Sequence, residues 1–549
     1  MRRREAIQSL ATLPLVGALM HETCEADSKP DSTVVGGPSA STTTRDPLYD
    51  PKLHLFVDDH GVLRSSNVSR MLGRPKKHSV PVVRSDRPWE SPWVYAWGSV
   101  LREPDSGLFR MWYETMGYNG TICLHRLCYA ESDDGVVWRK PALGRYTMEG
   151  CDSTNIIDIT SAAHTPGDLR GEAAFKRADV KYLGPGQALY EFVNYVDGSN
   201  VVRDDNEPDP AKRYKYVAAM WHKELNGGWA HYLLTGPDGI HWNMPPQKIL
   251  KVNDGTKVVW DSARRLWILT WLSSELTPSG TVIRRLEMAE SPDLIDWTQV
   301  GRPFELDEAD GKGTIIQGHF LLPFAYGDQY VGVANMIHTQ EGWAQGFLVS
   351  SRDGRHWDRH FRNTPFLPLG PEEDFDGDSA EVSLSPPILV GDELFIYYCG
   401  RSHRHWAPVA ATGAIGLLRM KRDRFAGLNN GGWFNREANN NRNDDAEVVT
   451  KPVEVSGPKL YANLRSRSTD HRAPQYDSTA WGSVRAELLD ESEMPIAGYT
   501  LAESVPYRGD EVRAVMQWKG HDNVAELQGK KVHVRFVFNM ATIYAYTFA

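Results

Sequence analysis

LVSSRDGRHW (348–357) is the clearest copy of a short pattern that recurs along the chain. The pattern is a β-rich run, a Ser, an acidic residue, usually a Gly, and then a Trp. Its other copies are YAESDDGVVW (129–138), LLTGPDGIHW (233–242), MAESPDLIDW (288–297) and the degenerate GLLRMKRDRF (416–425). A recurring segment at this spacing indicates a repeat architecture.

Each copy is predicted to form a tight hairpin. Asp-Gly supplies the positive φ angles of a two-residue turn, and the following Trp opens the returning strand. We therefore expect the turn acids to have a structural role as caps of the hairpin. These acids are Asp134, Asp238, Asp293 and Asp353.

A second hairpin signal with an apolar strand precedes every copy. The segments are DSGLFRMWYE (105–114), AKRYKYVAAMW (211–221), DSARRLWILTW (261–271), YGDQYVGVANM (326–336) and VGDELFIYYCG (390–400). Each unit then contains four strands, and four-stranded units at this period are typical of propeller blades. Two stacked sandwiches would not need the same hairpin in every unit. The sequence predicts an all-β protein that contains a five-bladed β-propeller.

The flanks of the repeat complete the domain plan. LHLFVDD (53–59) is a candidate strand for closing the ring, so the propeller is predicted over 49–428. An Asn/Gly-rich linker loop follows at 429–447. Short strands with turns then predict a C-terminal β-sandwich over 448–549.

The N-terminus has the features of an export signal. Three arginines at 2–4 precede eleven uncharged residues (10–20), a run too short to span a bilayer. We expect a signal resembling the twin-arginine type over 1–26, a Ser/Thr/Gly/Pro-rich linker over 27–48, and a periplasmic or extracellular location without membrane insertion.

Composition narrows the function classes. The 549 residues carry a net charge of −10, with 61 basic against 71 acidic residues, so nucleic acid is not an expected partner. Hydrophobic residues make up 41% and charged residues 24%, which excludes a disordered chain. The 18 Trp suit β-sheet cores or surfaces that stack on sugar rings. The Cys spacing does not match a zinc site.

Several local motifs resemble one family of propeller enzymes. They are PWE (88–90), RMWYE (110–114), RYKYV (213–217), GDELFIYY (391–398) and GKKVHVRF (529–536). With the S-x-D-G-x-x-W hairpins and the C-terminal sandwich, they make residues 50–549 similar to the glycoside hydrolase clan of families 32, 43, 68 and 117, with family 32 nearest in domain order. The resemblance implies a five-bladed propeller followed by a β-sandwich, and a carbohydrate substrate.

Glycoside cleavage requires two carboxyl groups, one as acid and one as nucleophile or base. We looked for them just before the inner strands, because those positions surround one axial pocket. The candidates are Glu90, Asp254, Asp378 and Glu381, the last two in a run of acids whose mutual repulsion could raise the pKa of one member. Less distinctive acids in the other blades are Asp197, Asp204, Glu308 and Asp310.

Aromatic and basic residues near these acids are candidate substrate ligands. Trp93 and Trp97 could stack on pyranose rings, and His319 lies in a strand of the fourth blade. Arg401 and His403, in RSHRHW (401–406), could hold a carboxylate, sulfate or phosphate.

The leading functional prediction is a secreted glycoside hydrolase acting on an oligo- or polysaccharide. One alternative is a glycoside phosphorylase, in which the Arg/His cluster handles phosphate. Another is a non-catalytic carbohydrate-binding propeller, supported by the absence of W-M-N-D-P, R-D-P and E-C-P motifs typical of family 32. No metal or other cofactor is expected, apart from the option of a structural calcium ion in the propeller channel.

Overall fold

A computed structural model of the protein describes residues 46–549, except for 91–92, 119–122, 149, 163–179, 194, 223–227, 252–254, 277–281, 308–309, 311–315, 383–384, 405–411, 431–444 and 467–481. In these ranges the secondary structure is β-strand with short 3-10 helices, so the all-β prediction is confirmed. The 3-10 helices are η1 (Pro88–Glu90), η2 (Leu189–Glu191), η3 (Pro210–Lys212) and η8 (Ala525–Leu527). None of the described helices has the length and apolar character needed to cross a bilayer.

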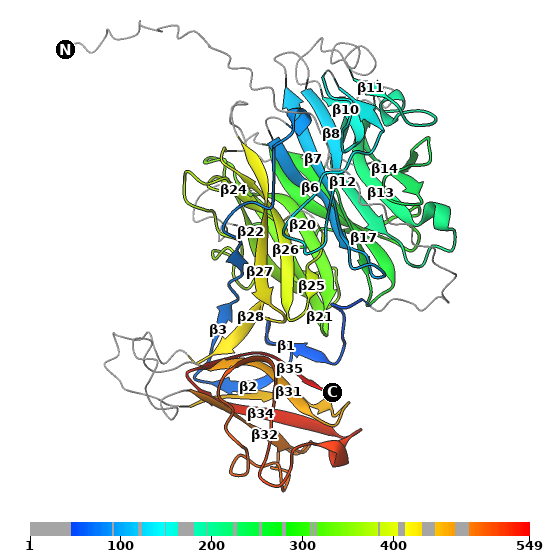
Figure 1. Ribbon diagram of the computed structural model, residues 1–549. Helices are drawn as coiled ribbons and strands as arrows, with labels where there is room; N and C mark the ends of the chain where they lie inside the picture. The colour runs from blue at the N-terminus through cyan, green and yellow to red at the C-terminus, as the bar shows by residue number, and fades with distance from the viewer. Residues whose placement is uncertain are drawn as a thin grey trace, which may run out of the picture.

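The upper part of the molecule in Figure 1 is the five-bladed propeller. Within each blade, consecutive strands pair antiparallel. Blade 1 comprises β6 (Trp93–Arg102), β7 (Phe109–Tyr118), β8 (Cys123–Ser132) and β10 (Ile156–Ala162). Blade 2 comprises β12 (Tyr195–Arg203), β13 (Tyr214–His222), β14 (Gly228–Gly236) and β15 (Gln247–Leu250). Blade 3 comprises β16 (Lys257–Asp261), β17 (Leu266–Leu276), β18 (Val282–Ser291) and β19 (Thr298–Gly301).

The last two blades share a sheet with blade 1. Blade 4 comprises β20 (Ile316–Tyr326), β21 (Gln329–His338), β22 (Ala344–Ser351) and β23 (Trp357–Asp358). Blade 5 is built on β26 (Glu393–Arg401) and β27 (Gly413–Lys421), with β24 (Ser379–Glu381) and β25 (Ile388–Val390) both paired to β26. Blade 1 joins blade 5 through a parallel pairing between Trp93 of β6 and Gly413 of β27. Two short strands, β9 (Tyr146–Thr147) and β11 (Lys181–Tyr182), pair beside blade 1.

The lower part in Figure 1 is a β-sandwich. One sheet has the order β3-β28-β35-β31-β33 with β1 on β35, and the other has the order β2-β29-β34-β30 with β32 on β34. The C-terminal strands are β28 (Ala426–Asn429), β29 (Ala446–Thr450), β30 (Val453–Glu454), β31 (Leu460–Ser466), β32 (Ser483–Leu489), β33 (Asp510–Val515), β34 (Lys531–Asn539) and β35 (Ala541–Phe548). A single apolar core, which includes Leu464, Trp518 and Phe536, lies between the sheets.

The N-terminal strands correct one expectation. β1 (Leu53–Leu55) was predicted to close the propeller ring, but it pairs with β35 of the sandwich. β2 (Val62–Ser66) and β3 (Ser69–Leu72) also join sandwich sheets. The strands that reach blade 5 from the N-terminal side are instead β4 (Lys76–Lys77) and β5 (Val83–Arg84), which pair with β27. The alternation of buried and less buried residues in LHLFVDD is compatible with a propeller sheet and with a sandwich sheet, so the sequence did not distinguish the two.

The repeated turns have the predicted structural role. In each of the four clear copies, a carboxylate oxygen of the turn Asp accepts hydrogen bonds from two backbone N–H groups downstream, at 2.8–2.9 Å. The next residue has a positive φ of 69–76° in all four, including Leu294 where Gly is replaced. Trp357 is buried, and the other three turn Trp side chains are half-buried.

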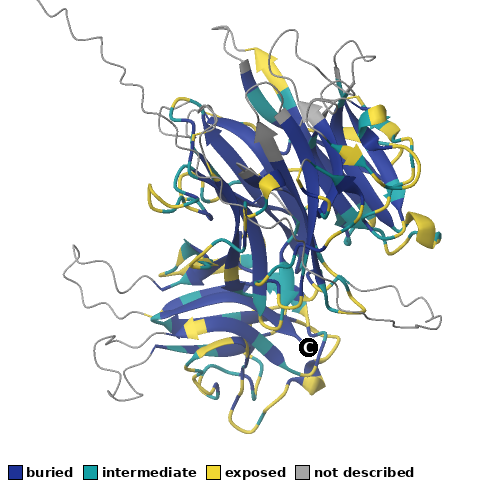
Figure 2. Ribbon diagram, turned by 45° about the horizontal axis from the view of Figure 1, so that its top comes forward, coloured by how far each residue is buried: buried dark blue, intermediate teal, exposed yellow. Residues whose placement is uncertain are grey.

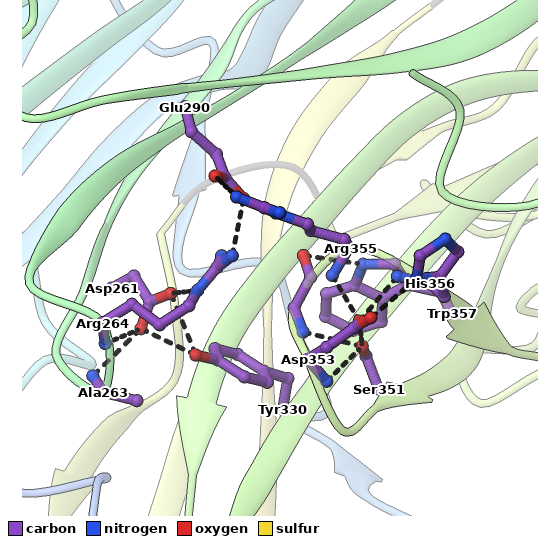
Figure 3. A network of polar contacts seen from close by, with 11 residues as sticks. Asp261, Ala263, Arg264, Glu290, Tyr330, Ser351, Asp353, Arg355, His356 and Trp357 are labelled. Atoms are coloured by element: carbon purple, nitrogen blue, oxygen red, sulfur yellow. Dashed lines mark hydrogen bonds and ion pairs between the residues drawn. The ribbon is translucent and has the colours of Figure 1, made fainter. Parts of the chain in front are cut away.

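The same turns connect neighbouring blades. Trp112 of blade 1 donates its indole N–H to the carbonyl of Gly239 in the turn of blade 2, at 2.7 Å. The Tyr397 hydroxyl of blade 5 donates to the carbonyl of Gly135 in the turn of blade 1, at 2.7 Å. Between blades 3 and 4, the Glu290 carboxylate binds both Arg264 and Arg355, the latter from the turn of blade 4 (Figure 3). The turns of blades 1, 2 and 4 therefore each close their own hairpin and also bind an adjacent blade.

Candidate functional site

Each of the five blades contributes one site side chain near the start of its innermost strand. The five residues are Trp97 of β6, Asp197 of β12, Lys257 of β16, His319 of β20 and Glu381 of β24. Inner strands of a propeller run side by side around the axis, so their first residues share one end of the channel. The strands that carry them lie in the buried interior, dark blue in Figure 2.

β-Bulges direct several of these side chains. The register of β20 against β21 shifts between Gly318 and Phe320, so His319 is an extra residue in the strand. The register of β12 shifts just after Asp197, and that of β6 shifts between Tyr95 and Ser99, around Trp97. Bulges re-aim side chains and are common beside active sites.

Glu381 is the best-held acid of this cluster. Its side chain is fully buried, and it accepts hydrogen bonds from Arg401 Nη2 at 2.9 Å and Ser379 Oγ at 3.1 Å. His319 Nδ1 donates to its other oxygen. Asn335 bonds both backbone groups of Val382, which fixes the strand behind Glu381. The carboxylate is therefore oriented by three side chains and a supported backbone.

The bases around Glu381 respond to burial in different ways. Burial lowers the pKa of His319, although Glu381 acts in the opposite direction, so the imidazole is neutral near pH 7. Arg401 is 3% exposed, and Glu381 raises its pKa despite the burial, so the guanidinium stays charged. Burial and the charge of Arg401 lower the pKa of His403 to about 4. The ion pair with Arg401 stabilises the charged form of Glu381.

A second buried acid comes from blade 1, the neighbour of blade 5. Glu114, on β7, is fully buried and accepts hydrogen bonds from His125 Nε2 at 3.0 Å and from the backbone N–H of Ser199 at 2.6 Å. Burial alone would lower the pKa of His125, but Glu114 raises it. Ser199 lies in the bulge that follows Asp197, so this bond ties blade 1 to the start of β12. Glu114 thus supports the strand that presents Asp197.

Lys257 occupies the centre of the cluster. Its side chain is 1% exposed, and its Nζ lies 5.0 Å from the ring centroid of Phe320. Burial lowers the pKa of Lys257 to about 8, against the effect of the carboxylates of Glu114, Asp197 and Glu381. These acids belong to blades 1, 2 and 5, and Phe320 belongs to blade 4. Only a position at the axis brings one ammonium close to all of them.

The predicted aromatic platform is partly described. Trp97 is 9% exposed, stacks on Tyr95 with ring centroids 4.9 Å apart, and meets the His319 ring edge-on at 5.8 Å. It therefore forms a wall of the axial cluster. The side chain of Trp93 lies outside the described residues.

Glu90 lies in a buried network of blade 1 and shares no described partner with Glu381, so its catalytic role stays a prediction. Its carboxylate is fully buried, where it accepts hydrogen bonds from Lys140 Nζ at 2.7 Å, Tyr113 OH at 2.5 Å, and the backbone of Asp86 and Arg87. Burial raises its pKa, with Lys140 opposing. PWE forms η1, which turns Glu90 inward to blade 1 contacts and not to the partners of Glu381.

The other acids near the inner strands have different surroundings from Glu381. Asp378 is half-buried, with Arg404 Nε 3.9 Å from its carboxylate. Asp376 is hydrogen bonded to Lys77 at 2.6 Å and to Tyr398 at 2.8 Å, whereas Glu381 of the same run contacts His319 and Arg401. Asp254 lies outside the described residues, and its catalytic role stays a prediction. Asp261, at the turn after β16, accepts hydrogen bonds from the backbone N–H groups of Ala263 and Arg264 in its own turn (Figure 3).

Sequence reasoning missed Lys257, Glu114 and His125. A Lys in a strand is usually exposed, and Glu114 sits within RMWYE, a motif used here only as a family likeness. Alternation gave no signal for Glu114, because both faces of β7 are buried: Trp112 and Glu114 on one face, Met111 and Tyr113 on the other.

A cavity of about 970 Å³ lies at the opposite end of the inner strands. Its walls include the later residues of β6, β12 and β16, with Tyr49, Trp260 and Phe324 among the aromatic side chains. Within the described residues, no group of three His, Cys, Asp or Glu side chains could hold a metal ion.

Comparison with known proteins gives structural similarities only. No family model matches the sequence, and no curated protein matches it. Among solved structures, a fructofuranosidase variant from Schwanniomyces occidentalis complexed with fructosylnystose has a TM-score of 0.38 at 10% identity, covering 86% of this chain and 98% of that one. A glycosyl hydrolase from Bacteroides ovatus has a TM-score of 0.40 at 12% identity, over 64% of this chain and 95% of that one.

A thermostable family-43 glycoside hydrolase has a TM-score of 0.36 at 11% identity, over 64% of this chain and 90% of that one. The chain is thus similar to glycoside hydrolases of the propeller clan at low sequence identity.

Proposed function

We propose that the axial cluster binds a carbohydrate and hydrolyses a glycosidic bond. The observation that supports this most is the approach of two acids, Asp197 and Glu381, to one buried ammonium at the axis. Glycoside hydrolysis needs two carboxyl groups with different protonation tasks on either side of the bond. The stacked pair of Tyr95 and Trp97 adds a flat apolar wall suited to a sugar ring.

The contacts of each acid suggest its role. Arg401 and His319 keep the Glu381 carboxylate charged and oriented, which suits a nucleophile or a base that activates water. Asp197, half-buried at the start of β12, is then the acid that protonates the departing oxygen. Water supplies the hydroxyl group to one product and, through the acid, the proton to the other.

The experiment is product analysis with purified protein on a panel of plant and microbial oligosaccharides. Glu381→Gln and Asp197→Asn should each lower turnover at least about 100-fold on any glycan that the wild type cleaves. Glu290→Gln is the matched control, because Glu290 is also buried and paired with two arginines but lies between blades 3 and 4. Full turnover by Glu381→Gln would refute the assignment.

A second candidate function is a non-catalytic carbohydrate-binding propeller. Its support is that Glu114 and Glu381 are fully buried and already hydrogen bonded to neighbouring bases. Binding of glycans without cleavage of any member of the panel would favour this function over hydrolysis.

We also propose that residues 1–26 direct export. The charge and length of the N-terminal segment support this, and Cys151 is disulfide-bonded, as is common in oxidising compartments. The test is described with the other predictions below.

A further inference from the structure

We propose that the sugar bound at the axial site carries an acidic substituent, a carboxylate or a sulfate ester, held by Lys257 and Arg284. This inference rests on the proposed function, because it names the class of substrate for the same site.

The Lys257 ammonium is the first observation. It is 1% exposed, and none of the described residues accepts a hydrogen bond from its Nζ. A buried ammonium offers three N–H donors, and leaving them unmet costs several kcal/mol. The ammonium therefore needs oxygen acceptors that a bound molecule can bring.

The acids nearby do not meet this need. Glu381 is already hydrogen bonded to Arg401, Ser379 and His319. Glu114 is hydrogen bonded to His125 and to the backbone of Ser199. Each of these two carboxylates therefore has a basic partner of its own, and Asp197 acts on Lys257 through its charge without accepting a hydrogen bond from Nζ, so the ammonium donors stay open to a ligand.

Arg284, on β18, is a second uncommitted cation. The described residues provide no hydrogen bond or ion pair to it, whereas its neighbour Arg285 pairs with Glu275 at 3.3 Å. Arg284 is close enough to His319 that its charge contributes, after burial, to lowering the pKa of that imidazole. Adjacent residues of a strand point to opposite faces, so Arg284 faces the site and Arg285 faces away.

Two cations that lack a hydrogen-bond acceptor among the described residues, one of them deeply buried, match an anionic ligand better than a neutral one. Arg binds carboxylate and sulfate oxygens through paired N–H donors, and Lys binds them as a compact charge. Tyr95 and Trp97 would receive the sugar ring that carries the group.

The test is calorimetric binding of matched sugars to the full-length protein. The probes are glucuronic and galacturonic acid, glucose and galactose, and galactose 6-sulfate. We expect at least one acidic sugar to bind at least tenfold more tightly than its neutral counterpart, and Lys257→Met to abolish that advantage. The carboxylate and sulfate arms distinguish the two anions. If no acidic sugar is preferred, or if Lys257→Met keeps the preference, the inference is wrong.

Arg284→Gln should reduce the preference several-fold, with Arg285→Gln as the control that leaves it unchanged. Thermal unfolding tests a purely structural role: Lys257→Met should unfold no lower than the wild type, and a marked fall would show that the ammonium serves Glu114 and Asp197 instead. A protein that prefers acidic sugars but cleaves none would refute hydrolysis alone. Cleavage of glycans by a wild type that shows no preference for acidic sugars would refute this inference alone.

Discussion

Truncating Trp357 to Ala should destabilise the propeller strongly. The indole is 5% exposed, meets Tyr330 edge-on at a centroid distance of 6.4 Å, and lies so close to Gly332 that a Cβ there would come within 2.9 Å of the ring. Its removal leaves a cavity between β21 and β22. Buried Trp truncations cost about 3–5 kcal/mol, and the tight packing places this one in the upper half of the range.

The equivalent change in blade 3 provides the comparison. Trp297 is half-buried, and its N–H donates to the carbonyl of Leu294 at 2.9 Å. Because its indole buries less apolar area than that of Trp357, Trp297→Ala should cost about 1–2 kcal/mol of stability. Urea unfolding followed by far-ultraviolet circular dichroism measures both. Equal losses in the two variants, or a larger loss for Trp297→Ala, would refute the account of how the repeated hairpin packs.

Three further predictions concern the turn acids, Glu90 and the N-terminus. Burial opposes ionisation of Asp353, but bonds from His356 and the backbone hold its pKa below the usual 3.8. Its stabilising effect is therefore present above about pH 4 and lost below it, so the difference in stability between wild type and Asp353→Asn should shrink as pH falls from 6 to 3. Glu90→Ala should lower the free energy of unfolding by about 2–4 kcal/mol, because Tyr113 loses its acceptor and Lys140 keeps only Asp86 and the Arg84 carbonyl, with glycan binding retained. A stable variant that no longer cleaves would show that Glu90 belongs to the site. Replacing the arginines at 2–4 with Lys should trap precursor in the cytoplasm, measured by fractionation, and undiminished export would exclude the twin-arginine route.

The repeat was predictable because its signal is local. Asp353, Gly354 and Trp357 carry the turn within a few residues, and the same spacing recurs in other blades. β1 was misassigned because pairing partners far apart in sequence leave no local mark: LHL alternates as a half-buried strand should, whether its neighbour is in the propeller or is β35.

The site was less predictable because bulges decide which side chains face the axis. His319 was predicted as a substrate ligand from its place in a strand, but the register shift of β20 that directs its side chain has no local sequence signal. Glu90 and Glu381 both come just before or within an inner strand, but η1 turns one into blade 1 and β24 presents the other to the axis. Nothing in the sequence around Lys257 distinguishes it from an exposed Lys; its burial results from the packing of the five blades around the axis.

A crystal structure of the protein with an oligosaccharide tests the central claim most directly. We predict that a sugar ring stacks at Tyr95 and Trp97 and that the glycosidic oxygen lies between the carboxyl groups of Asp197 and Glu381. The separation of those groups would also give the stereochemistry, about 5–5.5 Å for retention and about 6.5–9.5 Å for inversion. A sugar bound in the cavity at the opposite end of the channel, beside Trp260 and Phe324, with the axial cluster untouched, would contradict the account.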